Sequence, residues 1–207
     1  MKSTAAAHAI QGLIKYHGLK DKKRRLPYHD SISVCVDSLT TTATVEFCNQ
    51  FEKDVARING VEANANEAAR ILAVVDPLRK LAKTKARYRL ASQNSLLEGK
   101  GLGFSAAAFA AISLATATAL KLNLPPERLS EFARLGAGSA SRSLVGGFSI
   151  WYAMRRGRSY ARQLASENQL PFAMGVIPIA SEIKTDRAHD KNLHPIWPRI
   201  KSKLPNL

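Results

Sequence analysis

The feature that most constrains this chain is an uncharged stretch from Phe104 to Leu120, FSAAAFAAISLATATAL, in which alanine, serine and threonine predominate. The stretch is shorter than the ~20 apolar residues that a helix needs to cross a bilayer. Small side chains on all sides instead favour a helix enclosed by other elements of a folded domain. We therefore predict a buried helix over 104–120 and no association with a membrane.

The other segments predict an α+β fold, in which strands come first and helices later. Five segments have the β-branched or alternating composition of strands: 31–38, 41–48, 86–92, 146–154 and 172–180. The Asn59-Gly60 pair between two short apolar runs predicts a two-residue hairpin turn. Helical spacing of apolar residues predicts a helix over 64–83, which Pro77 is expected to kink or divide. The segment PPERLSEFARLG predicts another helix that begins at its prolines.

The chain carries 31 lysines and arginines against 16 acidic residues, a formal net charge of +15. Such a charge implies attraction to anions, which include phosphorylated metabolites, nucleic acid and anionic membrane surfaces. The densest basic run, from Lys20 to Arg25, is typical of a solvated loop. Because the basic residues lack interleaved aromatics and no RNA- or DNA-binding motif appears, nucleic acid is not expected as a partner.

Cysteine content and the N-terminus bear on localisation. Two cysteines, Cys35 and Cys48, are present, which fits a reducing compartment. The N-terminal sequence MKSTAAAHAIQGLIKYHG lacks the apolar core of a signal peptide. We expect a cytoplasmic protein.

A possible phosphate-binding loop, GLGFSAAAF (101–109), stands at the start of the predicted buried helix. Gly101 and Gly103 allow positive φ and close backbone approach, so that successive N–H groups, with those of the helix N-terminus, can point at one anion. The hydroxyl of Ser105 in the first turn could bind a phosphate oxygen or help to hold a magnesium ion. A Gly-x-Gly before a helix is also a common turn, so the stretch alone leaves both interpretations open.

Two further clusters could bind anions. IKYHGLKDKKRRLPYHDSIS (14–33) gathers Tyr16, His17 and many basic residues around a glycine and a proline, either as a small-anion site or as a basic surface hairpin. GAGSASRSLVGGF (136–148) places Ser139 and Arg142 among glycines. Arginine suits bidentate recognition of carboxylate or phosphate, and a serine-rich helix N-cap is the alternative interpretation.

Together these three stretches resemble the GHMP kinase superfamily and, within it, the decarboxylases of the mevalonate pathway. GLGFSAAAF is similar to the Gly-Leu-Gly-Ser-Ser-Ala type of phosphate loop. IKYHGLKD followed by LPYHDSISV resembles the Lys-Tyr-Trp-Gly-Lys and Leu-Pro-x-Asn-x-Ser-Ile-Ser segments. GAGSASRS resembles the Gly-Ser-Gly-Ser-Ala-Cys-Arg-Ser motif, and the order and spacing agree over about residues 2–190.

Within the decarboxylases, the sequence is closer to the archaeal-type phosphomevalonate enzymes than to the diphosphomevalonate enzymes. The residues that carry this closer resemblance are His17, Leu19 and the Tyr28-His29-Asp30 run. A nonbasic residue at Leu19 fits a substrate with one phosphate fewer, although Lys20 stands next to it. By resemblance, residues 1–190 form an α+β, GHMP-type N-terminal domain with a left-handed β-α-β phosphate-binding unit, and residues 191–207 form an irregular, proline-containing tail.

The resemblance also implies a reaction and a set of site residues. The implied reaction is ATP-dependent decarboxylation of (R)-5-phosphomevalonate to isopentenyl phosphate, with magnesium bound beside the ATP. Gly101, Gly103 and Ser105 would bind the nucleotide phosphates. Arg142 would bind the substrate carboxylate and stabilise developing charge in the reaction. Further residues would orient the substrate: Tyr16, His17, Ser139 and Thr185.

Two departures from the family pattern leave alternatives open. Phe104 replaces the first serine of the phosphate loop, which keeps an ATP-independent decarboxylase of mevalonate 3,5-bisphosphate open beside a diphosphomevalonate decarboxylase. Family members also continue into a second half that supplies a catalytic aspartate in a Gly-rich segment, and no aspartate of this chain matches it. We therefore expect the C-terminal half to be absent, so that an inactive fragment also stays open. A basic nucleic-acid-binding module is the least favoured alternative, and a homodimer is possible.

Overall fold

A long central strand organises the fold. The computed structural model describes residues 1–96, 102–170, 173 and 175. β4 (Ser31–Cys48) is an 18-residue strand in a seven-stranded mixed sheet. β1 (Lys2–Ile14) pairs antiparallel with one edge of β4. The opposite edge is shared by β7 (Arg87–Asn94), which pairs with the C-terminal part of β4, and β8 (Phe148–Trp151), which pairs with its N-terminal end.

The remaining strands extend the sheet on both sides. β5 (Val55–Ile58) runs parallel to β7, and β6 (Val61–Glu62) is its antiparallel partner. β9 (Ala161–Ala165) pairs with β8 at the other end of the sheet. β2 (Leu19–Asp21) and β3 (Leu26–Pro27) form a separate small hairpin. Because a helix connects β5 and β7, these elements form a β-α-β unit with parallel neighbouring strands.

The two strands predicted over 31–38 and 41–48 are one strand. Two consecutive residues of β1 pair with Thr40 and Val36 of β4, so that the intervening residues 37–39 bulge out of the ladder. A bulge bends a strand without ending it, which explains why the composition there suggests a break. β1 itself is not among the predicted strands. It is rich in alanine, which has a low intrinsic strand propensity.

The predicted helices are confirmed. α1 (Ala65–Leu81) begins with a capping box in which Asn64 and Glu67 bond each other's backbone N–H groups. α1 continues past Pro77 as a single helix, so the prediction that Pro77 divides it is wrong. Buried neighbours, Val74, Val75 and Leu78, hold this part of the helix against the core. α2 (Phe104–Ala119), α3 (Pro126–Gly136) and the short α4 (Ala140–Val145) follow.

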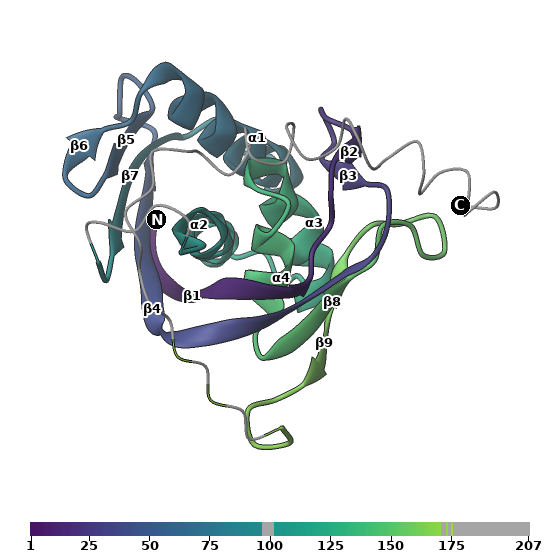
Figure 1. Ribbon diagram of the computed structural model, residues 1–207. Helices are drawn as coiled ribbons and strands as arrows, with labels where there is room; N and C mark the ends of the chain where they lie inside the picture. Colours follow the sequence, from purple (N-terminus) through teal and green to yellow (C-terminus); the bar gives the residue numbers. More distant parts are fainter. Residues whose placement is uncertain (97–101, 171–172, 174, 176–207) are drawn as a thin grey trace.

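The helices lie on the inner face of the curved sheet, with α2 closest to β1 and β4 (Figure 1). Most of α2 is buried, as predicted, and its alanines let it approach both strands closely. Gly136 at the end of α3 allows a similarly close contact with α2. A Cβ at Gly136 would lie 2.1 Å from the Phe109 ring. Small residues therefore set the spacing between layers.

Turn geometry explains the bounds of two other elements. Asn59 and Gly60 have φ values of 50° and 82° and join β5 to β6, which confirms the predicted hairpin. β8 begins later than predicted because Gly146 and Gly147 both have positive φ. The predicted strand over 172–180 and the predicted tail over 191–207 lie outside the described residues, apart from Ala173 and Gly175. Within the described ranges, the helices are too short or too polar to span a bilayer.

Candidate functional site

Arg142 on α4 is a buried cation whose hydrogen-bonding capacity is largely unused. Only 3% of the residue is exposed, and its Nε and Nη1 atoms are buried without a hydrogen-bond partner among the described residues. Burial lowers the pKa of the guanidinium to about 10, and the nearby Tyr16 raises it in part. Leaving buried donors unpaired costs about 1–3 kcal/mol. This arrangement favours binding of an anion, whose oxygens would satisfy those donors.

Two aromatic rings form one wall beside Arg142. The Arg142 guanidinium carbon lies 5.7 Å from the centroid of the Tyr16 ring. That ring meets Trp151 edge-on, with centroids 4.9 Å apart and planes at 83°. Trp151 is fully buried, and its indole N–H donates to the Ser159 hydroxyl at 3.0 Å. The wall is therefore rigid and presents the polar end of Tyr16 beside a positive charge.

Gly138 provides the space for this wall. A Cβ at Gly138 would lie 2.8 Å from Cη2 of Trp151 and 2.9 Å from Oη of Tyr16. Any larger residue would displace one of the two rings. Gly138 of the GAGSASRS motif is thus explained by the close approach of the turn before α4 to the aromatic wall.

A row of buried serines lies beneath α4 on β4 and β8. Ser33 and Ser149 are paired in the sheet register, and their hydroxyls are 3.4 Å apart. Ser31, paired with Trp151, is fully buried, and its hydroxyl is without a hydrogen-bond partner in the described part of the chain. Neither Ser31 nor Trp151 is among the predicted site residues. Ser31 stands in the LPYHDSISV segment that resembles a family motif, but its alternating SIS pattern indicates a strand as readily as a site.

The other predicted substrate-binding residues, besides Tyr16 and Arg142, are Ser139, His17 and Thr185. Ser139 is the half-buried N-cap residue of α4, and its side chain makes no capping hydrogen bond. The serine-cap interpretation is therefore not supported for Ser139. His17 follows Tyr16 and is exposed to solvent. Thr185 lies outside the described residues.

Two other serines of the motif serve the fold. The Ser141 hydroxyl donates to the Gly138 carbonyl oxygen at 2.8 Å. The Ser143 hydroxyl donates to the carbonyl oxygen of His8 and so ties α4 to β1. These hydroxyls are already engaged with backbone oxygens, which leaves Ser139 and Arg142 as the motif's candidates for ligand contact.

The N-terminus of α2 forms the second part of the site. Gly103, the N-cap, has φ of 85°, and a Cβ there would lie 2.8 Å from the Ile10 carbonyl oxygen. Close approach to β1 therefore requires glycine independently of any ligand. Ser105 in the first turn is exposed, so its hydroxyl can reach a ligand. Gly101 lies outside the described residues.

Phe104 does not project to the solvent side of this helix start. It is 7% exposed and belongs to a hydrophobic cluster of residues from β1, β4 and α2: Ala9, Val36, Leu39, Leu102, Phe104 and Ala107. The aromatic ring that replaces a serine is thus accommodated in the core. The exposed position of the first turn is held by Ser105.

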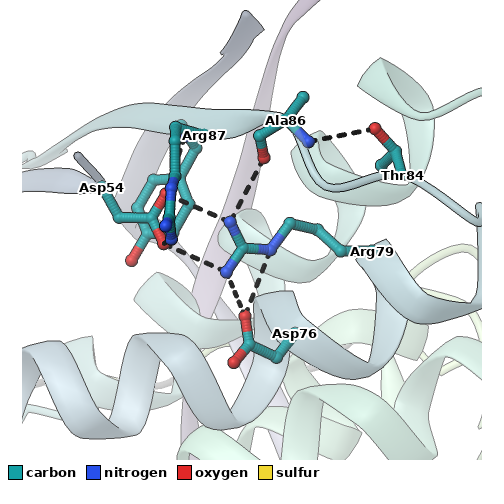
Figure 2. A network of polar contacts seen from close by, with 7 residues as sticks. Asp54, Asp76, Arg79, Thr84, Ala86 and Arg87 are labelled. Carbon is teal, nitrogen blue, oxygen red and sulfur yellow. Dashed lines mark hydrogen bonds and ion pairs between the residues drawn. The ribbon is translucent and has the colours of Figure 1, made fainter. Parts of the chain in front are cut away.

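Two acidic residues, Asp54 and Asp76, form a network away from Arg142. Figure 2 shows Arg79 of α1 held by Asp54 through two hydrogen bonds of 3.1 and 3.0 Å, and also paired with Asp76. Asp54 also accepts from the Tyr88 backbone N–H at 3.0 Å. This network joins α1 to β5 and β7 and is electrically compensated, so it is structural. The described residues contain no cluster of three His, Cys, Asp or Glu side chains that could hold a metal ion.

Comparisons with known proteins show the family of the chain. A family model described as the diphosphomevalonate decarboxylase-like N-terminal domain matches residues 7–162. The phosphomevalonate decarboxylase of Haloferax volcanii is 43% identical over 192 residues, covering 91% of this chain and 59% of the relative. The diphosphomevalonate decarboxylase of Saccharomyces cerevisiae is 33% identical over 190 residues, covering 84% of this chain and 48% of the relative. The chain thus spans about half the length of the curated relatives it matches.

Solved structures show the same fold. The mevalonate diphosphate decarboxylase from Trypanosoma brucei aligns with a TM-score of 0.83 at 25% identity, over 99% of this chain and 58% of that one. The enzyme from Enterococcus faecalis aligns with a TM-score of 0.77 at 29% identity, over 98% of this chain and 68% of that one. A further structure, described as MDDEF in complex with MVAPP, AMPPCP and magnesium, aligns with a TM-score of 0.75 at 28% identity, over 98% of this chain and 69% of that one.

Proposed function

Because this chain belongs to the family of diphosphomevalonate decarboxylase-like N-terminal domains, we propose that it binds a phosphorylated mevalonate and takes part in its ATP-dependent decarboxylation. The proposed substrate is (R)-5-phosphomevalonate. The products are isopentenyl phosphate, carbon dioxide, ADP and phosphate. The chain spans about half the length of its curated relatives. The decarboxylase activity is therefore proposed for the whole protein, and ligand binding is proposed for the residues described above.

The observation that carries the proposal is the buried Arg142 with its unpaired Nε and Nη1 atoms. A guanidinium can bind a carboxylate through two parallel hydrogen bonds. On binding, the substrate carboxylate supplies the negative charge that the described surroundings of Arg142 lack. In this proposal Tyr16 and Ser139 orient the substrate, and the exposed His17 contacts its outer part.

The start of α2 is the proposed nucleotide end of the site. The N–H groups at a helix N-terminus attract phosphate oxygens, and the Ser105 hydroxyl adds a donor. The residues present fit a nucleoside triphosphate, because the Phe104 ring lies in the core and Ser105 is exposed in the first turn. Magnesium would be held by the nucleotide phosphates with the help of Ser105.

The ATP supplies the phosphoryl group that turns the tertiary 3-hydroxyl of the substrate into a leaving group. Residues of this chain position that hydroxyl and hold the carboxylate while carbon dioxide departs. As the carbon–carboxylate bond breaks, its electron pair forms the double bond and the phosphate leaves. Arg142 stabilises the carboxylate before this step, and burial excludes water from the reacting atoms.

Selectivity for the monophosphate is proposed from the relatives and from β2. The relative with 43% identity is a phosphomevalonate decarboxylase. Leu19 at the start of β2 is half-buried and carries no charge, whereas Lys20 beside it is exposed. The uncharged side chain at Leu19 fits a substrate with one phosphate fewer, although Lys20 stands next to it.

Phosphorus NMR tests the reaction directly. The purified chain is incubated with 5-phosphomevalonate and magnesium, with and without ATP. Formation of isopentenyl phosphate and free phosphate only in the presence of ATP is the expected result. Product formation from mevalonate 3,5-bisphosphate without ATP would replace this proposal by the ATP-independent alternative. No product under either condition would overturn independent activity of this chain.

A further inference from the structure

The connection between β8 and β9 is a tight hairpin with arginines at its tip. Arg155 and Arg158 form reciprocal backbone hydrogen bonds of 2.8 and 3.1 Å. Between them, Arg156 and Gly157 have φ values of 50° and 75°, as in a two-residue turn with both central residues left-handed. The three arginines are exposed, so a short, well-ordered turn presents them to solvent together.

Two tyrosines lie among these arginines in the folded hairpin. The rings of Tyr152 and Tyr160 are 5.5 Å apart, centroid to centroid. Arg155 lies 4.5 Å from the Tyr152 centroid and Arg158 lies 5.4 Å from that of Tyr160. Arg158 also donates to Glu131, whereas Arg155 stacks on its ring and keeps its N–H edge available for phosphate oxygens. Basic and aromatic groups that alternate in this way are typical of surfaces that bind single-stranded nucleic acid.

An open hollow of ≈ 640 Å³ adjoins the hairpin at the N-terminus of α3, and it is lined by Pro125, Glu127, Arg128, Arg158, Tyr160 and Arg162. Glu131 pairs with Arg128 and Arg158 at one side of it. In the part of the chain that the structure describes, no acidic side chain forms an ion pair with Arg155, Arg156 or Arg162. The surface therefore keeps a positive surplus.

A second basic hairpin, β2–β3, is attached to the other end of α3. The Arg25 Nε donates to the Leu135 carbonyl oxygen at 3.0 Å, and Arg134 donates to the Arg24 carbonyl oxygen. Its turn carries the exposed Lys22, Lys23 and Arg24. Both hairpins project beyond α3 on the same side of the molecule in Figure 1. An 11-residue helix is about 16 Å long, so the two sets of cations suit an extended polyanion better than one small phosphate.

We propose that this basic hairpin surface, formed by the β8–β9 turn, Arg128, Arg162 and the β2–β3 turn, binds single-stranded nucleic acid. The arginines and lysines contact the phosphates, and bases stack at Tyr152 and Tyr160. An anionic membrane fits less well, because among residues 153–158 only Met154 offers an exposed large apolar side chain, whereas membrane binding grows with the apolar area that is buried. The proposal departs from the sequence-based expectation, because folding brings Tyr152 and Tyr160 together although eight positions separate them in the chain. It is independent of the decarboxylase proposal.

Fluorescence anisotropy with a labelled, mixed-sequence single-stranded RNA of about 12 nucleotides tests the surface. If four to six phosphates are contacted, the slope of log K against log salt concentration is roughly −3 to −4. The variant Arg155→Gln with Arg156→Gln should bind at least tenfold more weakly in low salt. Its slope should become shallower by about 1.4, since two phosphate contacts are lost.

The matched control is Arg57→Gln with Arg89→Gln, which removes the same charge from exposed positions on β5 and β7 at the other end of the sheet. The control should retain most of the affinity. Equal losses in both variants would mean a general effect of net charge and would overturn the proposal. Absence of RNA binding at low salt would also overturn the proposal. If phosphatidylserine vesicles bind in that case, the surface recognises a membrane and not nucleic acid. Arg162→Gln is a second variant, and thermal unfolding checks that each variant is folded.

Discussion

The backbone of Gly103 lies against the backbone of Ile10, so closely that a Cβ on Gly103 would be 2.8 Å from the Ile10 carbonyl oxygen and 3.2 Å from its nitrogen. This contact seats the start of α2 on β1. It also places the proposed nucleotide end and the strand that leads to Tyr16 in one rigid layer.

We predict that Gly103→Ala destabilises the fold more than Gly60→Ala does. Both glycines have φ near 80°, but a Cβ at Gly60 would meet nothing within 4 Å. Left-handed strain alone costs about 1–2 kcal/mol, and the clash at Gly103 should add about 1–3 kcal/mol. Urea unfolding measures both variants, and equal losses would show that the contact with Ile10 is unimportant.

The contact between Gly136 and Phe109 predicts a rescue. Gly136→Ala would place a Cβ 2.1 Å from the Phe109 ring and should cost about 1–3 kcal/mol of unfolding free energy. Phe109→Leu leaves a smaller side chain at that position. The double variant should therefore lose less than the sum of the two single losses. Strict additivity in the double-mutant cycle would contradict the packing described here.

The two carboxylates that hold Arg79 should differ in importance. Asp54 has a side chain that is 15% exposed and also accepts from Tyr88, whereas that of Asp76 is 43% exposed. We expect Asp54→Asn to cost about 3–5 kcal/mol, because it leaves a buried arginine poorly compensated. Asp76→Asn should cost less than about 1 kcal/mol. The reverse order in chemical denaturation would refute this assignment.

Cys35 provides a prediction about pH. Burial raises the pKa of its thiol to about 11 from an ordinary 9.0, and a hydrogen bond from the Gly147 backbone partly offsets the rise. Because the folded state disfavours the thiolate, the contribution of Cys35 to stability is present below pH 9 and is lost as the pH rises through about 11. In a Cys48→Ser background, alkylation by iodoacetamide should have its midpoint near pH 11 when folded and near 9 in urea. Identical midpoints would contradict the burial effect.

Much of the fold follows from local sequence patterns. The uncharged Phe104–Leu120 stretch predicts a buried helix because its composition leaves no polar face, and Asn59-Gly60 predicts its turn because few residue pairs accept two positive φ values. The alanine-rich β1 was not predictable in this way. Its strand form depends on pairing with β4 and packing under α2, which are contacts between distant parts of the chain.

The candidate site shows the same division. Arg142, Tyr16 and Ser139 could be predicted because their motifs resemble those of a family. Ser31 also stands in a family-like segment, but its pairing with Trp151 beneath α4 depends on the sheet register and could not be predicted. From the sequence, Phe104 in place of a serine leaves an ATP-independent enzyme open. That its ring packs with Val36 and Leu39 in the core could not be predicted from the motif.

Arg142→Met tests the central claim most directly, with Arg134→Met as the matched control. Arg134 is also partly buried and has an unpartnered Nε in the described structure, but it contacts the Arg24 carbonyl outside the aromatic wall. Thermal unfolding with and without saturating 5-phosphomevalonate is measured for each protein. The account predicts that the ligand stabilises the wild type and Arg134→Met. It predicts that Arg142→Met loses this shift while gaining about 1–3 kcal/mol of stability without ligand. An undiminished ligand shift in Arg142→Met would contradict the account.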